Sequence, residues 1–158
     1  MKVEFINPFV KAAIDVLRSE IKSDVERGKL RLETSSAASH DVSVMIGLTG
    51  DAQGVVLYGM QVETAVQIVS RMLDQECDEL DAMAQSGIAE MGNVITGLAS
   101  RGLSEAGFQC NITPPTLIVG KNTQIGTLDI PRIALPLKTE CGEIEINLAL
   151  RELKSQAA

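Results

Sequence analysis

The sequence of 158 residues has few of the side chains on which many binding sites depend. It contains no tryptophan, one tyrosine and three phenylalanines, too few for the aromatic stacking platforms of single-stranded nucleic-acid binders. Lys and Arg together number 14 against 21 Asp and Glu, which gives a formal net charge of -7. Binding through counterion release needs clustered positive charge, so we expect no nucleic-acid partner.

Cysteine and histidine are also scarce. Cys77, Cys110 and Cys141 are odd in number and show no C-x-x-C spacing, so we expect no disulfide framework and no metal site in this chain. The one histidine, His40, lies in the polar stretch 34–41 without an adjacent nucleophile, which favours a solvated loop residue. The nucleophile-elbow, P-loop, H-E-x-x-H and G-x-G-x-x-G motifs are absent. Hydrolysis with a histidine base is therefore not expected.

Long hydrophobic runs are missing too. Charged residues such as Lys2, Glu4 and Lys11 interrupt the apolar start of the chain, so nothing resembles a signal peptide or a membrane span. We expect a cytoplasmic protein with no membrane partner. The length and the apolar content of 45% fit one globular domain, which we place at residues 1–151, followed by a frayed tail at 152–158.

Three segments carry apolar residues at helical spacing. The first helix is expected to begin at an Asn7 cap with Pro8 in its first turn. The second covers roughly 62–75, and the third begins at an Asp78 cap and continues past Leu98. The expected core stripe of the third helix is Leu80, Met83, Ala84, Gly87, Ile88, Met91, Val94, Ile95 and Leu98.

Five β-favouring runs accompany the helices, at 43–49, 54–60, 116–119, 133–137 and 144–150. A turn at 50–53 makes a hairpin of the first two, and Pro136 indicates an edge strand or a bulge. Glu143, Glu145 and Asn147 alternate with apolar residues and are expected on a wet face of the sheet. The element order predicts an α/β fold in two layers, with a largely antiparallel sheet packed against the long third helix.

The side of the third helix away from its core stripe is unusual for a solvated face. Ser86, Glu90, Asn93 and Gly97 form a stripe roughly 130° from the centre of the expected core stripe, and Ala89 beside them is also small. An acid and an amide would therefore project side by side from a smooth surface, which favours docking of another protein. An exposed Glu and Asn three residues apart also occur on ordinary helices, so this spacing alone does not establish a site.

The run from Ser86 to Asn93, followed by NITPPTLIV at 111–119, resembles the S-x3-E-x2-N and downstream proline signature of the CheC/CheX/FliY phosphatase family. The opening FINPF at 5–9, leading directly into a helix, is similar to the CheX branch of that family. The resemblance extends over nearly the whole chain in motifs and in element order. It leaves open whether Pro114 or Pro115 corresponds to the family's proline.

This resemblance implies hydrolysis of the aspartyl phosphate of a CheY-like response regulator in chemotaxis. It implies that Glu90 pairs with a lysine of the regulator and that Asn93 orients the attacking water, with Ser86 as a helper and Ala89 and Gly97 in the docking face. The regulator would supply Mg²⁺ and the phosphorylated aspartate, and this chain would bind no cofactor. No second E-x-x-N lies on the first helix, so one site per chain is expected. The resemblance also implies a homodimer formed through the sheets.

Two other functions remain open at this stage. A CheC-like scaffold could bind a receiver domain or a flagellar-switch protein without catalysis, although docking alone would not require the amide of Asn93. An enzyme for a small phosphorylated metabolite is less favoured, because the sequence shows no phosphate-binding glycine loop and no arginine cluster.

Overall fold

The computed structural model describes residues 2–33, 37–121, 123–127 and 130–153. Within these residues the helices are α1 (Val3–Ile21), α2 (Val62–Leu73) and α3 (Ala82–Glu105). The strands are β1 (Glu26–Arg27), β2 (Arg31–Glu33), β3 (Ala37–Ser39), β4 (Val42–Gly50), β5 (Ala52–Met60), β6 (Cys110–Ile112), β7 (Thr116–Val119), β8 (Gln124–Gly126), β9 (Arg132–Thr139) and β10 (Gly142–Glu152).

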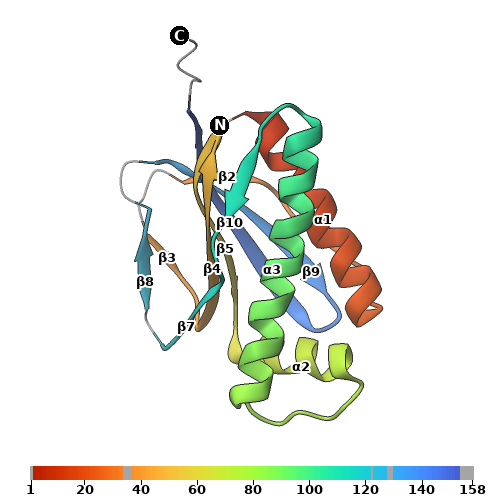
Figure 1. The fold of residues 1–158 in the computed structure, drawn as a ribbon. Coiled ribbons are helices and arrows are strands. Elements are labelled where there is room, and N and C mark those ends of the chain that lie inside the picture. The colour runs from red at the N-terminus through yellow and green to blue at the C-terminus, as the bar shows by residue number, and fades with distance from the viewer. Residues whose placement is uncertain (1, 34–36, 122, 128–129, 154–158) are drawn as a thin grey trace.

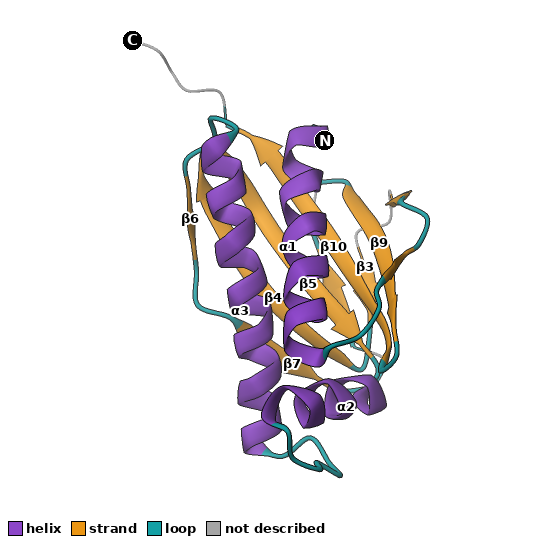
Figure 2. Cartoon of the chain, turned by 90° about the vertical axis from the view of Figure 1, so that its right-hand side faces the viewer, coloured by secondary structure: helices purple, strands orange, loops and turns teal. Residues whose placement is uncertain are grey.

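The described strands form one large antiparallel sheet and one small ribbon. The order in the large sheet is β1-β9-β10-β5-β4-β6, with β2 also paired to β9 and β7 also paired to β4. The three helices cover one face of this sheet, where α1 and α3 run side by side (Figure 2). The ribbon of β3 and β8 lies on the opposite side (Figure 1). The predicted two-layer α/β fold is confirmed, as is the hairpin between β4 and β5.

Helix α1 begins earlier than its sequence predicts. Lys2, not Asn7, is the N-cap, and Pro8 lies inside the helix. The extra turn buries Phe5, whose ring meets that of Phe108 edge to face with centroids 4.9 Å apart. Pro8 packs closely against α3, since a Cβ added at Gly102 would lie 3.0 Å from the Cβ of Pro8. The burial of Phe5 and the contact of Pro8 with Gly102 compensate for the helical hydrogen bond that Pro8 cannot donate.

The start of α3 also differs from the prediction. Asp81, not Asp78, caps the helix, because its side chain accepts a hydrogen bond of 2.8 Å from the backbone N–H of Ala84.

The buried face of α3 is rotated by about a quarter of a turn from the predicted stripe, taking about 100° per residue. Met83, Val94 and Leu98, all expected in the core, are 52%, 38% and 40% exposed. The close approach of Gly92 to the sheet explains the rotation, since a Cβ there would lie 2.7 Å from Cγ1 of Val44. The buried residues of α3 are Ala84, Ile88, Met91, Gly92, Ile95, Thr96, Ala99 and Leu103.

Strand β9 is not an edge strand, because it pairs with β10 on one side and with β1 and β2 on the other. Pro136 instead faces the break between β1 and β2, where its carbonyl oxygen accepts a hydrogen bond of 2.8 Å from the N–H of Gly28. The missing N–H of Pro136 thus coincides with an interruption of the neighbouring strand.

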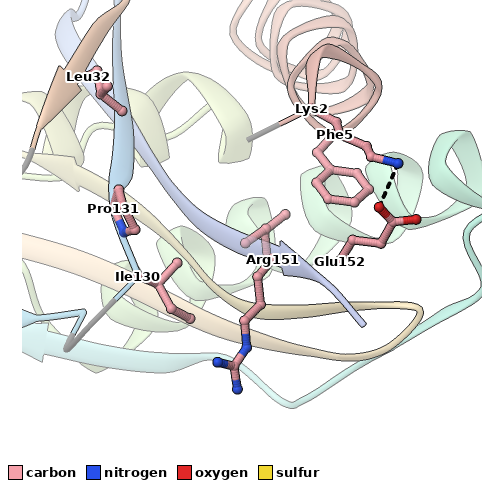
Figure 3. A pocket seen from close by; sticks show the side chains of 8 residues that line it. Lys2, Phe5, Leu32, Ile130, Pro131, Arg151 and Glu152 are labelled. Atoms are coloured by element: carbon pink, nitrogen blue, oxygen red, sulfur yellow. Dashed lines mark ion pairs between the residues drawn. The ribbon is translucent and has the colours of Figure 1, made fainter. Parts of the chain in front are cut away.

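Strand β10 continues to Glu152, one residue beyond the predicted domain end, and residues 154–158 of the predicted frayed tail lie outside the described residues. An ion pair of 2.5 Å between Lys2 and Glu152 joins this strand to the start of α1. It borders a pocket of about 510 Å³ in which Phe5, Ile130 and Arg151 also take part (Figure 3). None of the predicted site residues lines this pocket. Among the described helices, none combines the length and the apolar character needed to cross a bilayer.

Candidate functional site

The five predicted site residues all lie on the outward half of α3. Ser86, Glu90 and Gly97 are exposed, whereas Ala89 and Asn93 are half-buried. A Cβ added at Gly97 would meet no atom within 4 Å, so the helix backbone itself is open to a partner at that point. The structure therefore brings the acid, the amide and the small residues together on one face, as their spacing predicts. Their roles stay predictions.

The side chains of Glu90 and Asn93 have no polar partner among the described residues. Neither forms a hydrogen bond or an ion pair with any other residue in the part of the chain that the structure describes. An unengaged carboxylate can accept hydrogen bonds from a cation, and an amide can both donate and accept. The pair can therefore bind groups on a partner without first breaking a hydrogen bond or ion pair to another described residue.

The turn of α3 that carries Asn93 is fixed to the sheet on its buried side. The hydroxyl of Thr96 donates a hydrogen bond of 2.7 Å to the carbonyl oxygen of Gly92 and lies 2.7 Å from the hydroxyl of Tyr58 in β5. Tyr58 is fully buried, and this burial raises the pKa of its phenol, so it stays a neutral donor. These hydrogen bonds therefore hold this segment of α3 at a fixed distance from the sheet. The sequence alone does not predict this anchor, and Thr96, a polar residue among apolar neighbours, is the one local signal of it.

Strands β6 and β7 border α3 on the side toward which Asn93 is turned. Ser100, two turns after Asn93 on the same side of the helix, donates a hydrogen bond of 3.3 Å to the carbonyl oxygen of Cys110 in β6. Pro114 is exposed and Pro115 half-buried, and both lie in the connection between β6 and β7. The two prolines share this connection, so their position does not decide which one corresponds to the family's proline.

On the side of Glu90 away from Asn93, the surface of α3 carries large apolar side chains instead of small ones. Val94 follows Glu90 by one turn and Leu98 by two, and both are partly exposed. The apolar pattern of the sequence predicts these two residues in the core and only small residues around Glu90. A partner that meets Glu90 would therefore also meet partly exposed aliphatic side chains.

A polar cluster lies on the opposite face of the sheet, away from the helices. His40 is half-buried, and its Nε2 lies 3.2 Å from Oε1 of Glu145, which also accepts a hydrogen bond of 3.1 Å from Asn147. Arg31 contacts the other carboxylate oxygen of Glu145 at 2.9 Å, and Arg132 donates to Asn147 at 2.8 Å. His40 is thus not a solvated loop residue, and Glu145 and Asn147 do not form a wet face.

The hydrogen bond from His40, supported by those from Asn147 and Arg31, lowers the pKa of Glu145 to about 2, although burial alone would raise it. The carboxylate is therefore held ionised by several donors. Such an arrangement joins β2, β9 and β10 to the segment before β4, and we interpret the cluster as structural rather than catalytic.

No group of three or more His, Cys, Asp or Glu side chains that could hold a metal ion occurs among the described residues. Glu90, the one acid of the candidate site, would need ligands from elsewhere to bind a divalent cation.

Comparison with known proteins points to one family. The family model described as chemotaxis phosphatase CheX matches residues 42–138, from the start of β4 into β9 and including all of α3. CheY-P phosphatase CheX of Thermotoga maritima is 28% identical over 131 residues, which are 82% of this chain and 84% of that protein.

Solved structures agree with the family model. Chemotaxis protein CheX from Desulfovibrio desulfuricans is 27% identical with a TM-score of 0.86, and the match covers 96% of this chain and 100% of that one. A chain of the CheX–CheY–BeF3–Mg²⁺ complex from Borrelia burgdorferi is 32% identical with a TM-score of 0.83, again over 96% of this chain and 100% of the other. Both matches extend over nearly all of the elements described above.

Proposed function

Because the chain belongs to the CheX family of chemotaxis phosphatases, we propose that it hydrolyses the aspartyl phosphate of a CheY-like response regulator. The substrate is a phosphorylated receiver domain that docks against the outward face of α3. The observation that carries the proposal is the pair of Glu90 and Asn93, which form no hydrogen bond or ion pair with other described residues, on a helix that Thr96 and Tyr58 fix to the sheet.

Glu90 acts as the anchor in this proposal. Its carboxylate forms an ion pair with a lysine of the receiver domain, which brings the adjacent turn of α3 against the phosphorylated aspartate. Ser86 helps on the turn before it. Glu90 is exposed before docking, and its contact with the lysine contributes orientation as well as affinity.

Asn93 orients the attacking water. Its amide oxygen accepts a hydrogen bond from the water, whose oxygen attacks phosphorus in line with the bond to the aspartyl oxygen. That bond breaks, the aspartate leaves as a carboxylate, and the proton of the water passes to phosphate or to solvent. A neutral amide suits this position, because a second carboxylate would repel the anionic phosphoryl group.

This chain needs neither a nucleophile nor a metal site for such a reaction. We propose that the receiver domain holds the Mg²⁺, which neutralises charge on the phosphoryl oxygens, and that this chain binds no cofactor. Glu90 is the one carboxylate among the five candidate site residues, whereas a divalent cation takes several oxygen ligands. This chain contributes the amide of Asn93, which places the attacking water, and the carboxylate of Glu90, which binds the lysine of the receiver domain.

We also propose a cytoplasmic homodimer. The described strands β6 and β7 pair only with β4, so the outer edge of the sheet leaves backbone groups available for a second copy. The three cysteines are free, which fits a reducing compartment.

The direct test follows the decay of phosphorylated receiver domains from the same organism with and without this protein. Faster release of inorganic phosphate from one receiver supports the proposal. Binding without faster decay would instead support the CheC-like scaffold, in which case the amide of Asn93 would have no catalytic role. Neither binding nor faster decay with any receiver would exclude both.

A further inference from the structure

A groove of about 440 Å³ lies between α1 and the C-terminal part of α3, beyond the candidate site residues along that helix. Pro8 and Ala12 of α1 line it together with Leu98 and Gly102 of α3. The groove exists because the residues at this crossing are small, and Gly102 in particular has no room for a larger side chain beside Pro8. Leu98, 40% exposed, is the large apolar side chain that this arrangement leaves in contact with water.

The groove continues the proposed docking face. Glu90, Val94 and Leu98 follow one another at four-residue spacing, so they form one line along the surface of α3. Leu98 lies eight residues beyond Glu90, about 12 Å along the helix. A protein interface of standard size buries about 800 Å² on each partner, a patch of roughly 16 Å radius. A receiver domain centred on Glu90 therefore also covers Leu98.

The rims of the groove carry charges of both signs. Lys11 and Asp15 line it from α1, and Arg101 and Glu105 line it from α3. None of these four side chains forms an ion pair or a side-chain hydrogen bond within the described part of the chain. An apolar floor between charged rims fits a partner segment that is apolar on one side and charged on both flanks.

We propose that this groove is a second docking subsite for the same receiver domain, which seats an amphipathic surface helix there while its phosphorylated aspartate meets Glu90 and Asn93. The proposal rests on the proposed function. The walls are two helices whose backbone groups bond internally, so the groove offers no edge for an added strand and recognises side chains. The subsite sets affinity and the choice of receiver domain, whereas Asn93 sets the rate of the chemical step.

The test compares Leu98→Gln with Leu73→Gln. Leu73, the last residue of α2, is 39% exposed and does not line the groove, so the two substitutions change similar amounts of exposed apolar surface. The dephosphorylation rate is measured against the concentration of phosphorylated receiver. We expect Leu98→Gln to raise KM about five- to tenfold, the effect of losing contact with part of one leucine, with kcat within twofold. Leu73→Gln should leave both unchanged.

A binding arm uses the same receiver domain saturated with beryllium fluoride and Mg²⁺, and circular dichroism checks that each variant is folded. The Kd of Leu98→Gln should rise by the same factor as its KM. An unchanged KM and Kd for Leu98→Gln, while Asn93→Ala is inactive, would overturn the subsite and leave the proposed function intact. Wild-type protein that binds without hydrolysis would reject the catalytic proposal, and the binding arm would still decide the subsite. No binding by wild-type protein would overturn both.

Discussion

The hydroxyl oxygens of Tyr58 and Thr96 lie 2.7 Å apart in the core, between β5 and the turn of α3 that carries Asn93. The single hydroxyl proton of Thr96 is directed at the carbonyl oxygen of Gly92, so Tyr58 is the donor in this pair. The chain of hydrogen bonds therefore runs from Tyr58 through Thr96 to the backbone next to Asn93. It fixes the height of this turn over the sheet, while the face of the helix toward solvent stays free for a partner.

Removing the hydroxyl of Thr96 should destabilise the protein more than removing that of Tyr58. Thr96→Val leaves the phenol of Tyr58 buried without an acceptor and should lower the free energy of unfolding by about 1–3 kcal/mol. Tyr58→Phe leaves no donor unpaired and should cost about 1 kcal/mol. The double variant should lose less than the sum of the two, because no polar group then remains unpaired. Urea unfolding measures all three, and strict additivity would contradict a direct coupling of the two hydroxyls.

Asn93→Ala should fold normally and lose most of its activity. The side chain is half-buried but makes no hydrogen bond to other described residues, so the free energy of unfolding should change by no more than about 0.5 kcal/mol. Hydrolysis of the phosphorylated receiver should slow about 100-fold, the scale for removing one positioned polar group. Phosphate release at saturating receiver measures the effect. Activity at the wild-type rate would mean that Asn93 does not orient the water.

The sequence predicted those elements whose pattern is local and strong. The apolar spacing of α1 and the turn between β4 and β5 each lie within one short segment, and the structure confirms both the helix and the hairpin. The alternation at 144–150 correctly predicted a strand, but its expected wet face is wrong, because Glu145 is half-buried and Asn147 is buried. The pair of Glu90 and Asn93 was found for the same reason, since both residues lie on one turn of one helix.

Features that depend on contacts distant in sequence were not predictable in this way. His40 and Glu145 are 105 residues apart, so nothing local to either one indicates their contact. The rotation of α3 depends on Gly92 approaching Val44, and hydrophobicity alone favoured Val94 and Leu98 as core residues because they are larger. At this helix, the close packing of small residues against the sheet determines which face is buried, and the size of individual apolar side chains does not.

Glu90 should contribute to binding through its charge. Glu90→Gln keeps the size of the side chain but removes the charge that would meet a lysine of the receiver domain, so affinity and turnover should both fall. The loss should be larger at low salt, where the wild-type contact is screened least, and Glu90→Lys should be worse. Titration of an activated receiver domain at two salt concentrations tests this. Equal affinities for wild type and both variants would place Glu90 on an ordinary solvated face.

Glu145 should make stability depend on acid pH. Its folded pKa of about 2 lies below its ordinary value of 4.5, so the ionised form favours the folded state. This contribution is fully present above about pH 4.5 and is lost as the pH falls toward 2. Glu145→Gln should cost about 1–2 kcal/mol at pH 7, and this difference from wild type should shrink across that window.

The matched control is Glu143→Gln, an exposed glutamate two residues earlier in the same strand. It should change the free energy of unfolding little at any pH. Urea unfolding at a series of pH values compares the three proteins. A difference between wild type and Glu145→Gln that stays constant from pH 7 to pH 2 would show that the carboxylate is not held ionised by its donors.

Gly97 separates the effect of the docking face from that of the catalytic pair. Its added Cβ would meet no atom within 4 Å, so Gly97→Ala and Gly97→Gln should both stabilise this exposed helical position, by up to about 1 kcal/mol. Only the glutamine adds bulk between α3 and the receiver domain, and a displacement of about 1 Å can slow the reaction about 100-fold. Gly97→Gln should therefore be more heat-resistant and nearly inactive, whereas Gly97→Ala should lose much less activity. Ala89→Gln, at a half-buried position on the same face, should also be inhibited. Full activity of both glutamine variants in the phosphate-release assay would show that the receiver domain docks elsewhere, because a partner in contact with this face of α3 would meet both added side chains.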